Sequence, residues 1–138
     1  MPLLNPNRLF PLEKKTRDIA KKLYASVKDL PIISPHGHTD PYWFSENKHF
    51  KNPTDLFIKP DHYVFRMMFS QGISLQSLGI EELNKESHEK NSRKIWNLFA
   101  KNYYLFRGTP TKIWLDYVFE NLFGLNEPLN EKTAELYF

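Results

Sequence analysis

Apolar side chains recur at helical spacing along most of the chain. The lysines and arginines of residues 11–28 lie off one apolar face, which consists of Ile19, Ala20, Leu23 and Val27. Residues 92–106 give the strongest helical pattern, with a stripe made of Ile95, Leu98, Phe99, Tyr103 and Phe106. Residues 110–123 repeat it with Trp114, Leu115, Val118, Phe119 and Leu122. We therefore predict a mainly α-helical chain.

Residues 30–34 interrupt the helical pattern. Pro31 cannot continue the preceding helix, and the run Leu-Pro-Ile-Ile-Ser is typical of a short buried strand. After it, the chain never alternates convincingly with a period of two. We expect one or two short strands at most. Residues 1–40 then hold an arm, a helix and this strand, and residues 41–138 form a helical segment.

Polar residues beside prolines mark where several helices begin. Asp40-Pro41 and Asn52-Pro53 each fit an N-cap followed by proline at the first helical position. Asp61, which follows Pro60, can cap a helix that runs to about Gln71 and stops at the glycine after it. These three positions predict two short aromatic turns and one longer helix.

The last predicted helix is short. Asn130 can cap it, and residues 131–138 give barely two turns, which is marginal for a helix at a native terminus. We therefore expect the sequence to continue in a longer protein.

Composition narrows the class of protein. The 138 residues are 41% hydrophobic and 15% aromatic, which is too rich for a disordered chain. A mean hydropathy of -0.57 and the lack of a long apolar run argue against a membrane span. No signal peptide is recognisable at the N-terminus. The absence of cysteine excludes disulfides and thiolate metal sites, and is compatible with a cytoplasmic location.

The charge pattern argues against nucleic-acid binding. The net charge is +3, but the 19 lysines and arginines are scattered among 16 acidic residues without a dense basic block. A solvated surface of mixed charge is the better interpretation.

His36-Gly37-His38, at the end of the predicted strand, is the sharpest chemical feature. Residues i and i+2 of a strand point to the same face, so both imidazoles can converge on one divalent ion. Two ligands do not complete a catalytic zinc site, which normally takes three from the protein. Asp40 fits a capping role better than a ligand role. A chance pair of exposed histidines remains the alternative.

Asp61-His62-Tyr63, with Arg66 one turn later, is the second feature. A capping Asp61 places His62 and Tyr63 in the first helical turn, where free N–H groups and the helix dipole favour anions. Such a group of side chains could hold a sugar acid carboxylate, and a tyrosine hydroxyl can relay protons. The alternative is that Tyr63 packs in the core and His62 is an ordinary surface residue.

The remaining aromatic clusters predict packing. We expect Phe65, Met67, Met68 and Phe69 to fill the core, together with Trp96, Phe99, Tyr103, Trp114 and Phe119.

Three motifs together resemble one enzyme family. The run from Leu30 to Pro41, which contains His-Gly-His, resembles the first-strand motif of the uronate isomerases, members of the amidohydrolase superfamily. The segment Lys59-Pro-Asp-His-Tyr-Val-Phe-Arg-Met67 resembles their Asp-His-Tyr segment, and residues 111–117 with Phe123-Gly-Leu resemble the helix and turn that follow. The family usually has His-Cys-His in the first motif. The first motif alone is specific only for the superfamily.

The resemblance implies a fold, a reaction and roles for four residues. Family members form a (β/α)8 barrel with helices inserted after the first strand, so this chain would hold that strand and the helices but an incomplete barrel. They interconvert D-glucuronate with D-fructuronate, and D-galacturonate with D-tagaturonate. By resemblance, His36 and His38 ligate a divalent metal, Zn²⁺ being expected. His62 and Tyr63 contact the substrate, with Tyr63 near the migrating proton.

The resemblance also leaves questions and alternatives open. The remaining metal ligand, the catalytic aspartate and the main carboxylate-binding arginines of the family fall outside this chain, so we expect the chain alone to be inactive. The complete protein could form a homo-oligomer. Another metal-dependent hydrolase of the same superfamily fits His36-Gly37-His38 equally well. A non-catalytic helical interaction module is the alternative from another class, but it leaves the two histidines unexplained.

Overall fold

The structure is a computed structural model that describes residues 2–34, 36–81, 83 and 87–138. It confirms the predicted mainly helical architecture. The α-helices are α1 (Lys14–Ala25), α2 (Tyr42–Glu46), α3 (His62–Ser70), α4 (Ser92–Lys101), α5 (Pro110–Asn121) and α6 (Ala134–Tyr137). The π-helix η1 (Thr54–Ile58) and the 3₁₀-helices η2 (Gln76–Leu78) and η3 (Tyr103–Phe106) connect them.

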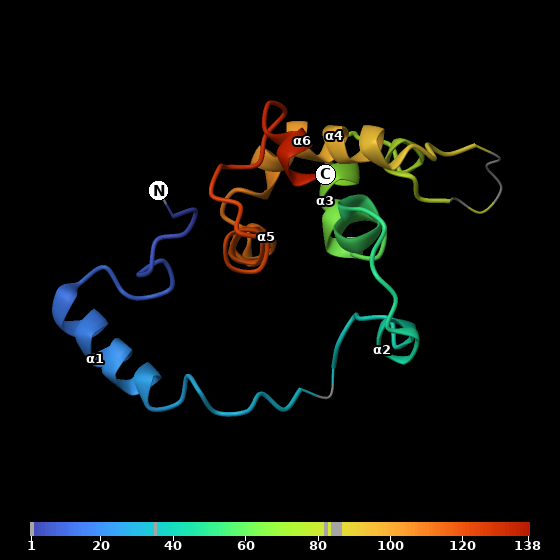
Figure 1. The fold of residues 1–138 in the computed structure, drawn as a ribbon. Helices are drawn as coiled ribbons and strands as arrows, with labels where there is room; N and C mark the ends of the chain where they lie inside the picture. Colours follow the sequence, from blue (N-terminus) through green and yellow to red (C-terminus); the bar gives the residue numbers. More distant parts are fainter. Residues whose placement is uncertain (1, 35, 82, 84–86) are drawn as a thin grey trace.

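The chain is divided into a packed helical body and an extended arm (Figure 1). In the body, α4 contacts η1 and α6, and α3 contacts η1 and η3. The arm carries α1 and then an extended segment that leads to α2, and it loops away from the body. No residue of α1 is buried. None of the helices in the described part of the chain is long and apolar enough to cross a bilayer.

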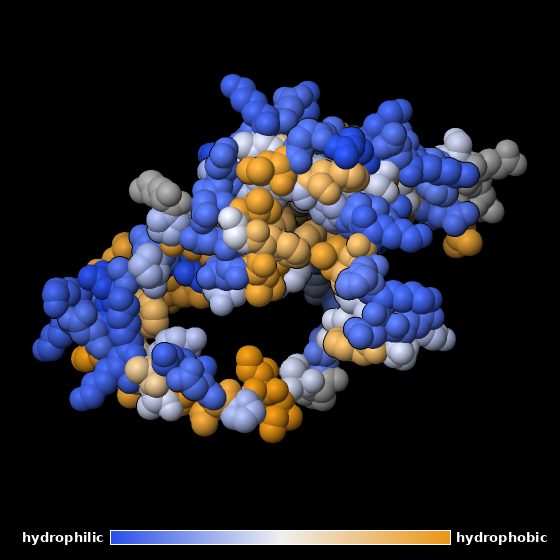
Figure 2. Space-filling model, viewed as in Figure 1, coloured by the Kyte–Doolittle hydropathy of each residue, from blue (hydrophilic) through white to orange (hydrophobic). Residues whose placement is uncertain are grey.

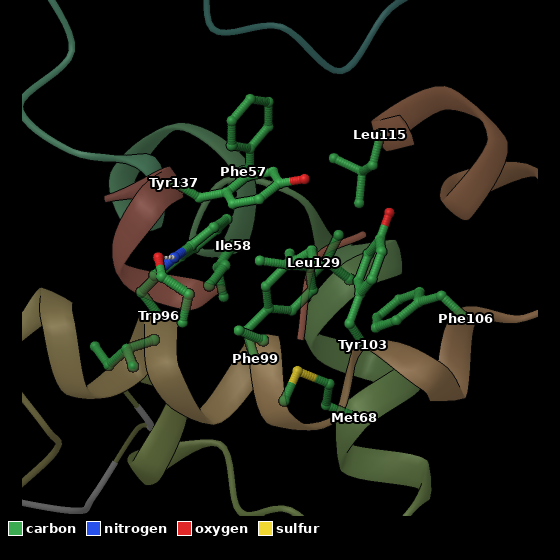
Figure 3. Packing of buried hydrophobic residues seen from close by; sticks show 14 of the residues in the cluster. Phe57, Ile58, Met68, Trp96, Phe99, Tyr103, Phe106, Leu115, Leu129 and Tyr137 are labelled. Atoms are coloured by element: carbon green, nitrogen blue, oxygen red, sulfur yellow. Dashed lines mark hydrogen bonds between the residues drawn. The ribbon is translucent and has the colours of Figure 1, made fainter. Parts of the chain in front are cut away.

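Aromatic side chains dominate the core of the body (Figure 3). Four of them are fully or almost fully buried, namely Trp96, Phe99, Phe106 and Phe119. Burying one such side chain stabilises the fold by about 1.5–3 kcal/mol. The indole Nε1 of Trp96 also donates a hydrogen bond to the carbonyl of Ala134 at 2.9 Å, which fixes α6 against α4. The predicted helical stripe of residues 92–106 is therefore the centre of the core.

Three of the predicted caps are present. The side-chain oxygens of Asp40 and Asp61 each accept a backbone N–H two residues later at 2.9 Å. Asn52 accepts the N–H of Asp55 at 3.0 Å. The fourth predicted cap, Asn130, was wrong in detail. Its side chain caps only a turn, and α6 begins later, at Ala134.

The predicted strand at residues 30–34 was wrong for this chain. No strand occurs among the described residues, so this segment has no neighbour with which to form a sheet. Its apolar residues are open to solvent, with Ile32 93% and Ile33 94% exposed. The predicted face of α1 is exposed as well, and hydrophobic side chains are visible along the arm in Figure 2. The backbone N–H and C=O groups of such an unpaired extended segment can still pair with another strand.

Three predicted core residues are also exposed. Trp114 is 50% exposed, and Leu122 and Phe69 face solvent as well. Successive helical residues are rotated by about 100°, so the neighbours Leu115 and Met68 take the buried positions. Leu122 lies just past the end of α5, where it no longer follows the buried face.

A buried carboxylate joins α5 to η3. Asp116 accepts a hydrogen bond from the Tyr103 hydroxyl at 2.8 Å and one from Lys112 Nζ at 2.7 Å. Burial raises the pKa of Tyr103 far above its ordinary value of 10.0, and the charge of Asp116 and the hydrogen bond to it raise that pKa further. Burial likewise raises the pKa of Tyr137 to about 12, with added contributions from Asp116 and Glu127.

Candidate active site

Four of the predicted site residues lie together. The rings of His36 and His38 have centroids 4.9 Å apart, and His38 lies 4.8 Å from His62. Tyr63 stacks on His38 with centroids 5.6 Å apart and planes inclined by 9°. His62 and Tyr63 are 4.4 Å apart. Two motifs that are more than 20 residues apart in the sequence thus form one cluster of three imidazoles and a phenol.

The start of α3 positions two of these side chains. Pro60 ends the preceding turn, and Asp61 is extended, with φ -100° and ψ 102°, so the helix cannot begin earlier. The carboxylate Oδ1 of Asp61 accepts the N–H of Tyr63 at 2.9 Å. His62 and Tyr63 therefore occupy the first turn, as predicted, and both face the His36–His38 segment.

The π-helix η1 anchors this region to the body. Thr54 is fully buried, and its hydroxyl donates to the carbonyl of Ser92 at 2.7 Å. Asp55 pairs with Lys59 at 2.8 Å. Burial raises the pKa of Asp55, but hydrogen bonds from Lys59 and Asn52 outweigh it, and the pKa is lowered overall. Because η1 ends just before Pro60, these contacts fix the point from which α3 starts.

The histidine pair fits part of a metal site. The Nε2 atoms of His36 and His38 are 2.9 Å apart, and both side chains are accessible. Nitrogen ligands lie about 2.0–2.1 Å from zinc, so two atoms at this separation can bind one ion. Neutral imidazole is also a suitable ligand for zinc and related ions. No group of three or more potential metal ligands occurs among the described residues, so this pair is an incomplete donor set.

Tyr63 is available for chemistry. It is 60% exposed, so the alternative that it packs in the core was wrong. His62 is half-buried beside it. Arg66 is exposed one turn further along α3, and the described part of the chain shows no contact between it and the four clustered rings. His49 is exposed outside the cluster, in keeping with its poor placement in the sequence.

A cavity of about 450 Å³ adjoins the cluster. His38, Thr39 and Asp61 form its polar side, and the other lining residues are Trp43, Leu56, Phe57, Pro60, Trp114, Val118, Leu122 and Phe123. Sequence reasoning missed Thr39, Trp43 and Trp114 as neighbours of the site. Trp43 could have been suspected from its closeness to His38 in sequence, but nothing in the pattern of α5 indicated that Trp114 faces this cavity.

The arrangement can support proton transfer beside a cation. A phenol and an imidazole in hydrogen-bonding reach of a bound molecule can exchange protons with it or hold its hydroxyl groups. The paired histidines would supply the position of the cation. The cluster and the helices around it thus form the candidate active site of the chain.

Comparison with known proteins identifies the family. Residues 8–138 match the glucuronate isomerase family. A uronate isomerase from Mesorhizobium japonicum is 52% identical over 136 residues, which cover 99% of this chain and 29% of that protein. One from Brucella canis is 53% identical over 135 residues, or 98% and 29% of the two chains. The crystal structure of glucuronate isomerase from Caulobacter crescentus matches with a TM-score of 0.89 and 50% identity, covering 98% of this chain and 28% of that one.

These matches extend over nearly the whole chain, including both motifs of the cluster. The chain belongs to the glucuronate isomerase family. It spans about 29% of the length of the curated relatives it matches.

Proposed function

We propose that this chain is the N-terminal part of an aldose–ketose isomerase that acts on uronates. The complete protein would interconvert D-glucuronate and D-fructuronate, and likewise D-galacturonate and D-tagaturonate. The observation that carries the proposal is the stacking of Tyr63 and His62 on His38 in a chain of this family. The same observation favours an isomerase over the metal-dependent hydrolases of the superfamily, because it brings the Asp-His-Tyr segment into contact with the histidine pair.

The reaction moves one proton between neighbouring carbons. A base removes the proton from C2 of the open-chain aldose, and the electron pair forms an enediolate between C1 and C2. The proton is delivered to C1, and a second proton passes from the C2 hydroxyl to O1. O1 then becomes a hydroxyl and O2 the carbonyl of the ketose, so no other reactant is required. The site must therefore supply an acid–base group and stabilise the developing oxyanion.

Three residues of α3 have separate roles in this proposal. The Tyr63 hydroxyl exchanges the migrating proton or donates to the enediolate oxygen. His62 holds a hydroxyl group of the sugar. Arg66 binds the carboxylate, for which its guanidinium offers two parallel donors. The exposure of Tyr63 and Arg66 supports direct contact of both with a substrate.

His36 and His38 would hold the divalent cation, with zinc as the expected ion. When bound, a cation of this kind polarises a substrate oxygen and stabilises negative charge on it. The separation of the two Nε2 atoms supports this assignment. In the proposal, the remaining ligand and the carboxylate base come from the rest of the protein, where the other strands of a (β/α)8 barrel would also pair with residues 30–34. The cytoplasmic location remains a prediction.

Turnover of the full-length protein tests the proposal. The protein that contains this chain is purified with zinc and incubated with D-glucuronate, and the ketose is measured over time. We expect full-length protein to form D-fructuronate, and the 138-residue chain alone to form none. The matched control is the full-length His36→Ala/His38→Ala variant. Absence of turnover by the metal-loaded full-length protein, or robust turnover by the isolated chain, would contradict the proposal.

A further inference from the structure

Asp61 fixes the backbone of Tyr63 at the start of α3. Its Oδ1 accepts the N–H of Tyr63 at 2.9 Å, and its carbonyl accepts the N–H of Val64 at 3.0 Å. The side chain is half-buried and borders the cavity beside His38. The capping bond of Asp61 therefore holds Tyr63 directly, through the backbone N–H of Tyr63.

We infer that Asp61 is a positioning residue for the isomerisation, and that its capping bond holds the Tyr63 phenol against His38. The inference rests on the proposed function for its kinetic consequences. A helix without its cap frays in the first turn, and that turn carries His62 and Tyr63. A displacement of about 1 Å at a reacting group can cost about 10²-fold in rate. The cap therefore contributes to catalysis through geometry and not through contact with the substrate.

A matched cap elsewhere in the chain separates positioning from stability. Asn91 also caps a helix with its side chain, since its Oδ1 accepts the N–H of Lys94, in the first turn of α4, at 3.1 Å. Asn91 does not line the cavity beside His38. Asn91→Ala removes a cap of similar kind and stabilising effect, so it should lower the melting temperature and leave kcat unchanged. Asp61→Ala should lower kcat of the full-length protein about 10–100-fold.

Two conservative variants test whether the capping bond is the relevant property. Asparagine and serine are good N-caps without a charge. Asp61→Asn and Asp61→Ser should therefore keep kcat within a few-fold of the wild-type value, even if Asp61→Ala does not fold. A large loss of kcat in a folded Asp61→Asn protein would show that the carboxylate itself takes part, and would overturn the inference.

The double variant supplies a readout that a general loss of stability would not change. If Asp61 acts through Tyr63, Asp61→Ala should have little further effect on kcat in a Tyr63→Phe background. Additive losses would mean that the two residues act independently.

A crystal structure of the metal-loaded full-length Asp61→Ala variant tests the positioning without depending on turnover. We expect the Tyr63 ring to leave its stacked position on His38. An unmoved Tyr63 would overturn the inference. Failure of the proposed function would appear separately, as an inactive wild-type protein.

Discussion

The phenol of Tyr63 and the imidazole of His38 are stacked nearly parallel, with ring centroids 5.6 Å apart and planes inclined by only 9°. One ring stands in the first turn of α3, and the other in the extended segment before α2. Because His38 is also one of the two candidate metal ligands, the stack places the candidate proton-transfer residue beside the position expected for the cation.

Removal of either histidine should weaken metal binding by the full-length protein. His36→Ala or His38→Ala removes one of two imidazoles whose Nε2 atoms are 2.9 Å apart. Removal of a side chain that supports a metal site commonly lowers metal affinity or activity by about 10–100-fold. The measurement is the amount of zinc retained per protein after dialysis against a weak chelator. His49→Ala is the control, since His49 is exposed outside the cluster. Wild-type zinc content in both variants would remove the pair from the site.

His62→Asn should affect substrate affinity more than turnover. His62 lies 4.4 Å from Tyr63 between ring centroids, where it can hold a sugar hydroxyl. Loss of one hydrogen bond costs about 1 kcal/mol, which corresponds to about a fivefold rise in KM. Steady-state kinetics of the full-length protein with D-glucuronate give both constants. His88→Asn, outside the cluster, should change neither constant. A fall in kcat without a change in KM would instead assign His62 to the chemical step.

The chain should lose stability at alkaline pH. Tyr103 and Tyr137 both have a pKa above the ordinary 10.0 in the folded state, because the ionised phenolate is disfavoured by burial and by nearby acidic groups. The folded state therefore keeps protons that the unfolded chain releases. This stability is fully present below about pH 10 and is lost as the pH rises, by about 1.4 kcal/mol per pH unit for each tyrosine.

Thermal melts of the chain at increasing pH measure this loss. Tyr103→Phe should reduce the alkaline decline, although it also removes the hydrogen bond to Asp116 and so lowers stability near neutral pH. The exposed Tyr104 provides the control, because Tyr104→Phe should leave the decline as steep as before. A melting temperature that stays constant up to about pH 12 would show that the two phenols ionise freely in the fold.

The sequence predicts local structure well where one residue determines it. Asp61 begins α3 because its side chain can reach a free N–H, and this chemistry does not depend on the rest of the protein. The apolar stripe of residues 92–106 also lies in the core, although Leu98 is only partly buried and the predicted helix is divided into α4 and η3. The candidate site was predictable to that extent, since His62 and Tyr63 had to share the first turn.

Structural features that depend on residues far away in the sequence could not be predicted from the local pattern. Ile32 and Ile33 have the character of a buried strand, yet a strand needs a neighbour, and the described residues offer none. Trp114 lies within an apolar stripe, but which side of α5 meets the body is decided by the packing of other helices. The stacking of Tyr63 on His38 likewise depends on the path of the chain between them.

Replacement of Tyr63 by phenylalanine in the full-length protein is the most direct test of the account. The substitution keeps the ring and its stacking on His38 and removes only the hydroxyl. Tyr104→Phe is the matched control, because the two tyrosines are 60% and 61% exposed. The measurement is steady-state conversion of D-glucuronate, with a thermal melt to show that each variant is folded. We predict that Tyr63→Phe lowers kcat and kcat/KM together by about 10²–10⁴-fold, as expected for a group that acts in the transition state. A folded Tyr63→Phe protein whose kcat equals that of Tyr104→Phe would contradict the central claim.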